Sequence, residues 1–229
     1  MGNKMKLEEY LNPPKLSIMV TTMPSRAWHL DNLISYFGMQ DAPMDFFDNG
    51  YGVIRRWNKD DVEIIAYVTP PYNDVDEGLT FGAKRNAILE IAKGDFVMSF
   101  DDDDKPHERF LELVLPHCVD GVDVIGYKVA CYGYANGCNS PEVMEPADVS
   151  TKYDGWYNDR NGFKYVRCPH HIVPVRREHV HAIGFKNVHH GEDHEYSLRL
   201  RDSGRLKNEA YIDEFMYLYM FDGKKKKGE

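Results

Sequence analysis

The chain has 229 residues, of which 42% are hydrophobic and 28% charged, and its formal net charge is −9. This composition is typical of a globular protein and excludes collagen-like, low-complexity and wholly disordered chains. The acidic excess disfavours broad electrostatic binding to nucleic acid or to an anionic membrane. The four cysteines contain no C-x-x-C pair, so neither a disulfide scaffold nor a four-cysteine zinc site is indicated.

The sequence contains no stretch that is typical of a membrane span. Its longest uninterrupted apolar run, 215–221, is far shorter than the roughly 20 residues that a membrane helix needs. Among the first 15 residues, charged residues stand where a signal peptide would need its apolar segment. We therefore expect a cytoplasmic protein without a transmembrane segment.

The first half of the chain alternates between strand and helix patterns. A short apolar run after a Pro-Pro break predicts a strand over 16–20, and helical spacing of apolar residues predicts a helix over 28–37. A second strand is predicted over 62–68, a helix over 81–92 and a third strand over 96–100. This order predicts an α/β fold, with a mostly parallel sheet and helices on both of its faces.

The second half is less regular. A helix is predicted after Pro106, followed by a fourth strand over 122–127. The segment 130–167 is rich in Tyr, Gly and Asn, and its turn signals at 136–137 and 161–162 predict hairpins or long loops. The remaining predicted elements are a strand over 172–175, helices from Arg177 and over 192–203, and a strand over 215–221 before a lysine-rich tail.

Four consecutive aspartates, Asp101 to Asp104, follow the third predicted strand. Open parallel sheets bind ligands beyond the carboxyl ends of their strands, and the polar segments Thr21-Thr22 and 69–74 follow the other two strands there. Several carboxylates at the end of a buried strand repel one another unless a cation neutralises them. The run therefore predicts a divalent metal that carries phosphate oxygens, although a solvated acidic turn before a helix would have a similar sequence.

A second acidic pair, Glu192 and Asp193, opens the helix predicted over 192–203. Acidic residues at a helix N-terminus are ordinary capping residues, so a structural role stays open. If the helix returns the pair to the metal crevice, one carboxylate could act as general base on an acceptor hydroxyl.

Three segments together resemble the GT-A-fold glycosyltransferases, most closely the large family 2 of inverting enzymes. LSIMVTTMPSR at 16–26 is similar to the opening strand of that family and its base-contacting turn. GAKRNAILEIAKGDFVMSFDDDDKP at 82–106 resembles its helix and D-x-D strand. The segment 170–204 resembles the acceptor-side region, which ends in the Glu-Asp motif and a basic helix.

This resemblance implies a GT-A-like, Rossmann-related sheet with an irregular acceptor-side region. The implied organisation is a single catalytic domain over residues 1–229. Its nucleotide-sugar-binding half spans about 15–127 and its acceptor-binding half about 128–221, followed by a basic tail at 222–229.

The resemblance also implies individual roles. Asp103 would be the direct ligand of Mn²⁺ or Mg²⁺, and Asp101 would support the metal-diphosphate cluster. Asp193 would be the catalytic base, and Glu192 would position the base or the acceptor. The residues expected along the nucleotide-sugar are Thr21, Thr22, Arg26, Lys84 and Arg85, with Asp102 at the ribose. The family usually carries an acidic residue after its second strand, and Asp74 would substitute for it here.

The expected function is therefore metal-dependent, inverting transfer of one sugar from a nucleotide-sugar, with a UDP-sugar expected, to an acceptor hydroxyl. Single transfer is favoured because the Gln/Arg-x-x-Arg-Trp motif of processive synthases is missing. The acceptor stays open among a glycan, a lipid-linked molecule, a protein and a modified nucleic acid. The oligomeric state stays open as well.

Two alternatives remain. A non-catalytic nucleotide- or metal-binding module could keep the same fold. A sugar-phosphate nucleotidyltransferase is disfavoured, because it needs a glycine-rich loop after the first strand and TTMPSR contains no glycine.

Other aromatic and histidine residues have an ordinary structural interpretation. The pairs His170-His171 and His189-His190 are interpreted as surface or packing residues, although one of His170, His171 and His194 could complete a metal shell. Trp156, with Tyr153 and Tyr157, is expected equally to stack on an acceptor or to pack within its own domain.

Overall fold

The computed structural model describes residues 13–48, 52–68, 79–133 and 144–221. Its centre is a parallel sheet, in which β1 (Leu16–Thr22) lies between β4 (Val62–Val68) and β5 (Phe96–Ser99). Each of these strands is a short run of almost wholly buried residues, as expected for a sheet covered on both faces. The predicted strands at the centre of the sheet are confirmed.

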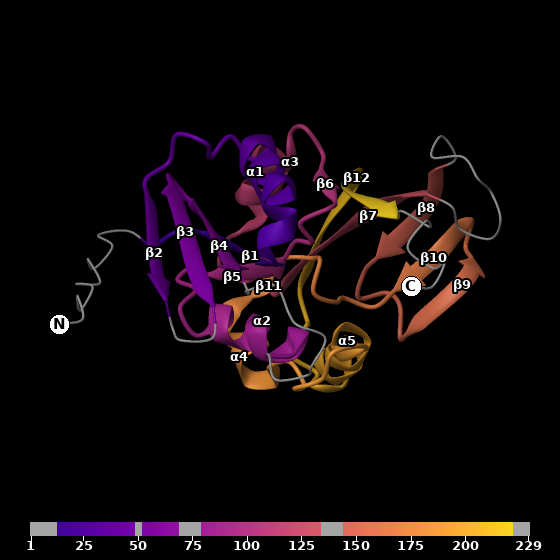
Figure 1. The fold of residues 1–229 in the computed structure, drawn as a ribbon. Helices are drawn as coiled ribbons and strands as arrows, with labels where there is room; N and C mark the ends of the chain where they lie inside the picture. Colours follow the sequence, from indigo (N-terminus) through magenta and orange to yellow (C-terminus); the bar gives the residue numbers. More distant parts are fainter. Residues whose placement is uncertain (1–12, 49–51, 69–78, 134–143, 222–229) are drawn as a thin grey trace.

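Helices cover both faces of this sheet (Figure 1). The helices α1 (Ala27–Tyr36) and α3 (Phe110–Val114) lie on one face. The opposite face carries α2 (Phe81–Leu89), α4 (Arg177–Ile183) and α5 (Glu192–Asp202). The predicted α/β class with helices on both faces is therefore confirmed, and the helix boundaries differ by a few residues from those expected.

An antiparallel hairpin that the sequence did not predict extends one edge of the sheet. It consists of β2 (Met44–Asp48) and β3 (Val53–Lys59), and β3 pairs antiparallel with β4. The strand β3 was not predicted because Arg56, which is buried, breaks the apolar pattern of a strand. Its guanidinium lies 3.4 Å from Glu63 on β4, and it donates to the carbonyl of Ile91 at 2.7 Å.

The acceptor-side half extends the other edge with further strands. The sheet order is β2-β3-β4-β1-β5-β11-β7-β8-β10-β9, and β12 pairs parallel with β7. The hairpin of β9 and β10 turns at Asn161-Gly162, where both residues have positive φ, so the turn predicted there is confirmed. The turn predicted at 136–137 lies outside the described residues. The bounds on this side are β7 Val124–Gly133, β8 Met144–Val149, β9 Trp156–Arg160, β10 Phe163–Arg167, β11 Val175–Arg176 and β12 Glu209–Phe221.

Several elements differ from their predicted lengths. The helix expected after Pro106 shortens to α3 and a 3₁₀ turn, η2 (Leu115–His117), because Pro116 cannot continue the α-helical hydrogen bonds. The last strand begins earlier than expected, at Glu209, and a short strand β6 (Lys105–Pro106) pairs with it. The strand expected over 172–175 is reduced to β11.

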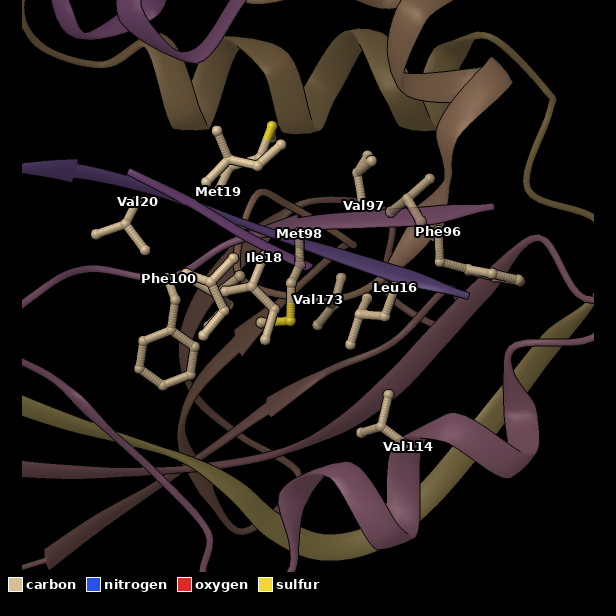
Figure 2. Packing of buried hydrophobic residues seen from close by; sticks show 14 of the residues in the cluster. Leu16, Ile18, Met19, Val20, Phe96, Val97, Met98, Phe100, Val114 and Val173 are labelled. Carbon is tan, nitrogen blue, oxygen red and sulfur yellow. The ribbon is translucent and has the colours of Figure 1, made fainter. Parts of the chain in front are cut away.

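The core fills the space between the central strands and the helices. Figure 2 shows side chains of β1 and β5 packed together, with Val114 of α3 facing them. Leu16, Ile18 and Phe96 are completely buried, and burying a side chain of this kind stabilises the fold by about 1.5–3 kcal/mol. Among the described residues, no helix is long and apolar enough to cross a membrane.

A buried carboxylate links the hairpin to this core. Glu63 is fully buried and accepts hydrogen bonds from Ser17 Oγ at 2.6 Å and from the backbone nitrogens of Lys93 and Gly94 at 2.5 and 3.2 Å. It is also the carboxylate that neutralises Arg56. The residue therefore ties β4 to β1, to β3 and to the loop after α2.

We expect Glu63→Ala to lower the free energy of unfolding by about 3–5 kcal/mol, because it leaves the buried charge of Arg56 uncompensated. Urea denaturation measures this loss. The matched variant Glu90→Ala changes an exposed glutamate at the end of α2 and should stay within about 0.5 kcal/mol of the wild type. Equal effects of the two substitutions would contradict this role of Glu63.

Candidate active site

The site begins where the parallel strands β1 and β5 end, because their carboxyl ends lie at the same edge of the sheet. Thr22, the last residue of β1, donates its hydroxyl hydrogen bond to Asp102 at 2.5 Å. Asp102 is buried, whereas the neighbouring side chain of Asp103 is 40% exposed. The polar residues that follow the two strands therefore meet, as the sequence predicted.

One arginine joins two of the aspartates. Arg26 ends the short 3₁₀ turn η1 (Pro24–Arg26) after β1. Its Nη2 atom lies 2.5 Å from Asp102 Oδ1 and 2.6 Å from Asp103 Oδ2. The two carboxylates thus converge on one cationic group.

A second arginine brings the other acidic pair to the same place. Arg85 of α2 is buried and forms an ion pair and hydrogen bond with Glu192, the first residue of α5. Its Nη2 atom also lies 3.6 Å from Asp101 Oδ1. Gly82 allows α2 to approach the segment before α5, because a Cβ atom there would overlap the carbonyl of Lys186. The helix α5 therefore returns to the acidic loop.

Two cavities meet at this point. The first has a volume of about 340 Å³ and is lined by the acidic loop, Arg26, Arg85 and the start of α5; we call it the donor-side cavity. The second has a volume of about 490 Å³ and is lined mainly by β7, β8, β10 and β12; we call it the acceptor-side cavity. Asp101, His171 and Asp193 line both cavities.

The glutamate and the aspartate at the start of α5 have different surroundings. Glu192 is buried and held by Arg85. Asp193 is partly exposed, and no hydrogen bond or ion pair joins its side chain to another described residue. Of the pair, Asp193 is therefore the carboxylate that can accept a proton from a group in the cavities.

The aspartates of the loop differ in pKa. Burial raises the pKa of Asp102 to about 6, although the charge of Arg26 acts in the opposite direction. Burial also acts to raise the pKa of Asp101, but the interaction with His171 and the charge of Arg85 outweigh it and hold that pKa well below its usual value. Asp101 is therefore ionised at neutral pH, whereas Asp102 exchanges its proton near pH 6.

The fourth aspartate of the run has a structural role. Asp104 is buried, and it accepts hydrogen bonds from the hydroxyl of Tyr217 at 2.5 Å and from the backbone nitrogen of Met220 at 2.7 Å. The Tyr217 hydroxyl accepts one from the backbone nitrogen of Asp101 at 3.3 Å. Strand β12 thus fixes the acidic loop from the acceptor side.

The side chains at the donor-side cavity suit a hard cation. Five carboxylates and two guanidinium groups line it, and carboxylate oxygen is the ligand type that Mg²⁺ and Mn²⁺ prefer. Within the described part of the chain, however, no group of three or more His, Cys, Asp or Glu side chains is arranged around a common metal position. Asp101 and Asp103 would hold such an ion, with substrate oxygens completing its shell.

Lys84, one of the expected nucleotide-sugar residues, does not join this cluster. Lys84 is buried, its ammonium group lies 5.2 Å from the ring centre of Phe81, and burial lowers its pKa. It is not among the residues that line the donor-side cavity, because it points to another side of α2 than Arg85. Asp74 lies outside the described residues. Thr21, Arg26 and Arg85 line the cavity.

Four histidines that the sequence analysis discounted lie at the cavities. His189 and His190 line the donor-side cavity, His170 lines the acceptor-side cavity, and His171 lines both. Residues 170–171 lie outside any strand, and their Nδ1 atoms are 3.3 Å apart. Burial holds the pKa of His170 well below its usual value.

Comparisons with known proteins identify the family. The sequence profile of glycosyl transferase family 2 matches residues 72–186, which is half of the chain and contains the acidic loop. This chain belongs to glycosyl transferase family 2. The expected family is thereby confirmed. No curated protein matches the chain by sequence.

Solved structures of TarS from Staphylococcus aureus show the same fold. Residues 1–349 of TarS superpose with a TM-score of 0.53 and 16% identity over 90% of this chain. The complex of TarS 1–349 with UDP-GlcNAc gives a TM-score of 0.53 over 94% of this chain. This chain spans 60% of the length of that TarS fragment and 37% of the longer TarS structure. The GT-A-like fold expected from the sequence is confirmed.

The shifted pKa of Asp102 predicts a pH dependence of stability. Its pKa is about 6 in the folded protein and about 3.9 in an unfolded chain. The stabilisation that its protonated form gives is therefore fully present below about pH 4 and is lost as the pH rises through 6. We expect Asp102→Asn to become more stable relative to the wild type by up to about 3 kcal/mol between about pH 4 and 7.

Urea denaturation at a series of pH values measures this difference. The control is Asp120→Asn, which changes a fully exposed aspartate, and its difference from the wild type should be nearly constant over the same range. A constant difference for Asp102→Asn would show that Asp102 has an ordinary pKa.

Proposed function

We propose that this chain transfers one sugar from a nucleotide-sugar, with a UDP-sugar as donor, to an acceptor hydroxyl with inversion at the anomeric carbon. The observation that carries the proposal is the junction of the two cavities at Asp101 and Asp193. One cavity has the acidic loop for the donor, and the other has the sheet surface for the acceptor. A reaction between the two substrates would take place where these cavities meet.

The charges in the donor-side cavity support a metal-dependent reaction. Carboxylates outnumber guanidinium groups there by five to two, so a diphosphate would bring further negative charge into an acidic cavity. We propose that Asp103 and Asp101 hold a divalent cation. When bound, such an ion would offset the negative charge that builds up on the departing diphosphate.

The protein residues around the donor have distinct proposed tasks. Thr21 lines the cavity at the end of β1, where it can contact the nucleoside. Arg26 already lies between Asp102 and Asp103, and it can turn toward phosphate oxygens once a cation neutralises those carboxylates. UDP as the nucleotide is proposed from the fold shared with TarS, which was crystallised with UDP-GlcNAc.

Asp193 is the proposed general base. Its carboxylate lines both cavities, so an acceptor hydroxyl beside it would also lie beside the donor. In the proposed step, Asp193 takes the hydroxyl proton while the acceptor oxygen bonds to the anomeric carbon and the bond to the diphosphate breaks. Glu192 is a positioning residue, because its ion pair with Arg85 fixes the first turn of α5.

Donor binding can be tested by thermal denaturation with a panel of nucleotide-sugars, each with Mn²⁺, Mg²⁺ or a chelator. We expect a UDP-sugar with Mn²⁺ to raise the apparent Tm by roughly 5–10 °C at a hundredfold excess over Kd, because it binds only the native state. Chelator and Asp103→Asn should each abolish this shift. Asp120→Asn is the control and should retain it.

The possible outcomes separate the alternatives. No shift with any nucleotide would overturn the transferase proposal. A shift that survives chelator and Asp103→Asn would overturn the metal site alone. Metal-dependent binding without transfer or hydrolysis would favour the non-catalytic module, and release of pyrophosphate from a nucleoside triphosphate would favour the nucleotidyltransferase.

The role of Asp193 predicts a second, separate result. Asp193→Asn should lower kcat by about 10²–10⁴, the usual contribution of a general base, and leave the donor Kd within about twofold. Turnover assays and the donor-induced Tm shift measure the two quantities. Glu195→Gln, two residues further along α5 and paired with Arg199, is the control. A parallel loss of turnover and donor binding in Asp193→Asn would contradict the base assignment.

A further inference from the structure

The wall of the acceptor-side cavity is one face of four neighbouring strands. Side chains alternate between the faces of a strand, so every second residue of β12, β7, β8 and β10 points to the same side. The strand register aligns Tyr217, Val129, Ala147 and Tyr165 in one row across the four strands. All four residues line the cavity.

The order of residues in this row gives the cavity its shape. The two central positions, Val129 and Ala147, are small, and the two outer positions, Tyr217 and Tyr165, are large. Neighbouring strands lie about 4.8 Å apart, so the outer positions are separated by roughly 14 Å. The row therefore forms a trough with a small floor and tyrosine walls. In the next row, Tyr219 continues one wall beside Cys131.

The trough has little capacity to bind an anion. Its arginine, Arg167, donates to the carbonyls of Tyr157 and Val166 at 2.5 and 2.9 Å and to Asn158 Oδ1 at 3.1 Å, so the protein already uses three of the five N–H donors of its guanidinium. Burial keeps His170 in the neutral form, because it lowers the pKa of that residue well below its usual value. The acidic side chains of the described lining are Asp101, Glu145 and Asp193.

We infer that the acceptor is an uncharged sugar and that one of its rings lies in this trough; this rests on the proposed function. The partly exposed rings of Tyr165 and Tyr219 offer apolar faces for the C–H groups of a sugar ring, whereas Tyr217 is fully buried and its hydroxyl bonds to Asp104. Ala147 leaves room for the ring on the floor. The acceptor hydroxyl points toward Asp193, at the end of the trough that joins the donor-side cavity.

The inference is tested with acceptor panels and three variants. The probes are the methyl glycosides of glucose, galactose, mannose and N-acetylglucosamine, together with cellobiose and maltose, and the charged counterparts glucuronate and glucose 6-phosphate. Release of UDP above the rate without acceptor measures transfer, and calorimetric titration in the presence of UDP and Mn²⁺ measures acceptor binding. We expect at least one neutral sugar to bind and react, and the charged counterparts to do neither.

Variants in the trough locate the acceptor. Ala147→Leu, which fills the floor, and Tyr219→Ala, which removes part of one wall, should each raise the acceptor KM about tenfold or more. Both should keep the Tm shift caused by the donor. Tyr36→Ala is the matched control, because Tyr36 on α1 is 47% exposed, close to the 40% of Tyr219, and does not line the cavity.

The readouts distinguish failure of this inference from failure of the proposed function. Loss of donor binding in the wild type would overturn both. If donor binding is intact, any of three results would overturn the inference and leave the proposed function standing. These are a preference for a charged sugar, the absence of any neutral sugar that binds or reacts, and equal effects of Tyr219→Ala and Tyr36→Ala.

Discussion

The structure depends on how five carboxylates are held around one small cavity. Like charges this close repel one another, and burial increases the penalty because water no longer screens them. Two arginines balance part of this repulsion. Arg26 forms ion pairs with both Asp102 and Asp103. Arg85 forms an ion pair with Glu192 and lies 3.6 Å from Asp101. The arginines come from the segments after β1 and β4, so the chain must fold as a whole before the carboxylates can meet.

The strand β12 connects this charged cluster to the acceptor-side half. Its residue Tyr217 has two contacts of different kinds, because the ring lines the acceptor-side cavity and the hydroxyl bonds to the acidic loop. The strand also pairs with β6, directly after the four aspartates, and runs parallel to β7. Displacement of β12 would therefore move the acidic loop as well as the acceptor wall. This coupling explains why Asp104 is buried in the structure rather than directed at the cavity.

The sequence predicted the parts of the molecule that have a regular local pattern. The central strands are short apolar runs, and α5 begins at an acidic turn and is followed by Gly204, which has positive φ. The sequence did not predict β2 and β3, because Arg56 is neutralised by Glu63 on the neighbouring strand, a contact that is visible only in three dimensions. The prediction of β12 was too short because Asp213 and Glu214 interrupt its apolar pattern.

The candidate site shows the same division between local and tertiary information. The meeting of the acidic loop with Glu192 and Asp193 followed from strand order and from the resemblance to a known family. The histidines at the cavities could not be ranked, because adjacent histidines have the same sequence whether they are packed or face a cavity. His170 and His171 lie in the segment between β10 and β11, and His189 and His190 lie in the segment between α4 and α5. Lys84 and Arg85 carry the same charge, so the sequence could not show which of them lines the donor-side cavity. The orientation of α2 places Arg85 there and not Lys84.

The different surroundings of Glu192 and Asp193 limit the chemistry of the site. A residue held in a buried ion pair is a poor proton acceptor, because protonation would leave its arginine partner uncompensated. Glu192 is in this position, so its interaction with Arg85 stabilises the geometry rather than the reaction. Asp193 follows it on the first turn of α5 and lines both cavities without a described partner. The ion pair that fixes the first residue of the helix therefore also holds the second one at the junction where a donor and an acceptor would meet.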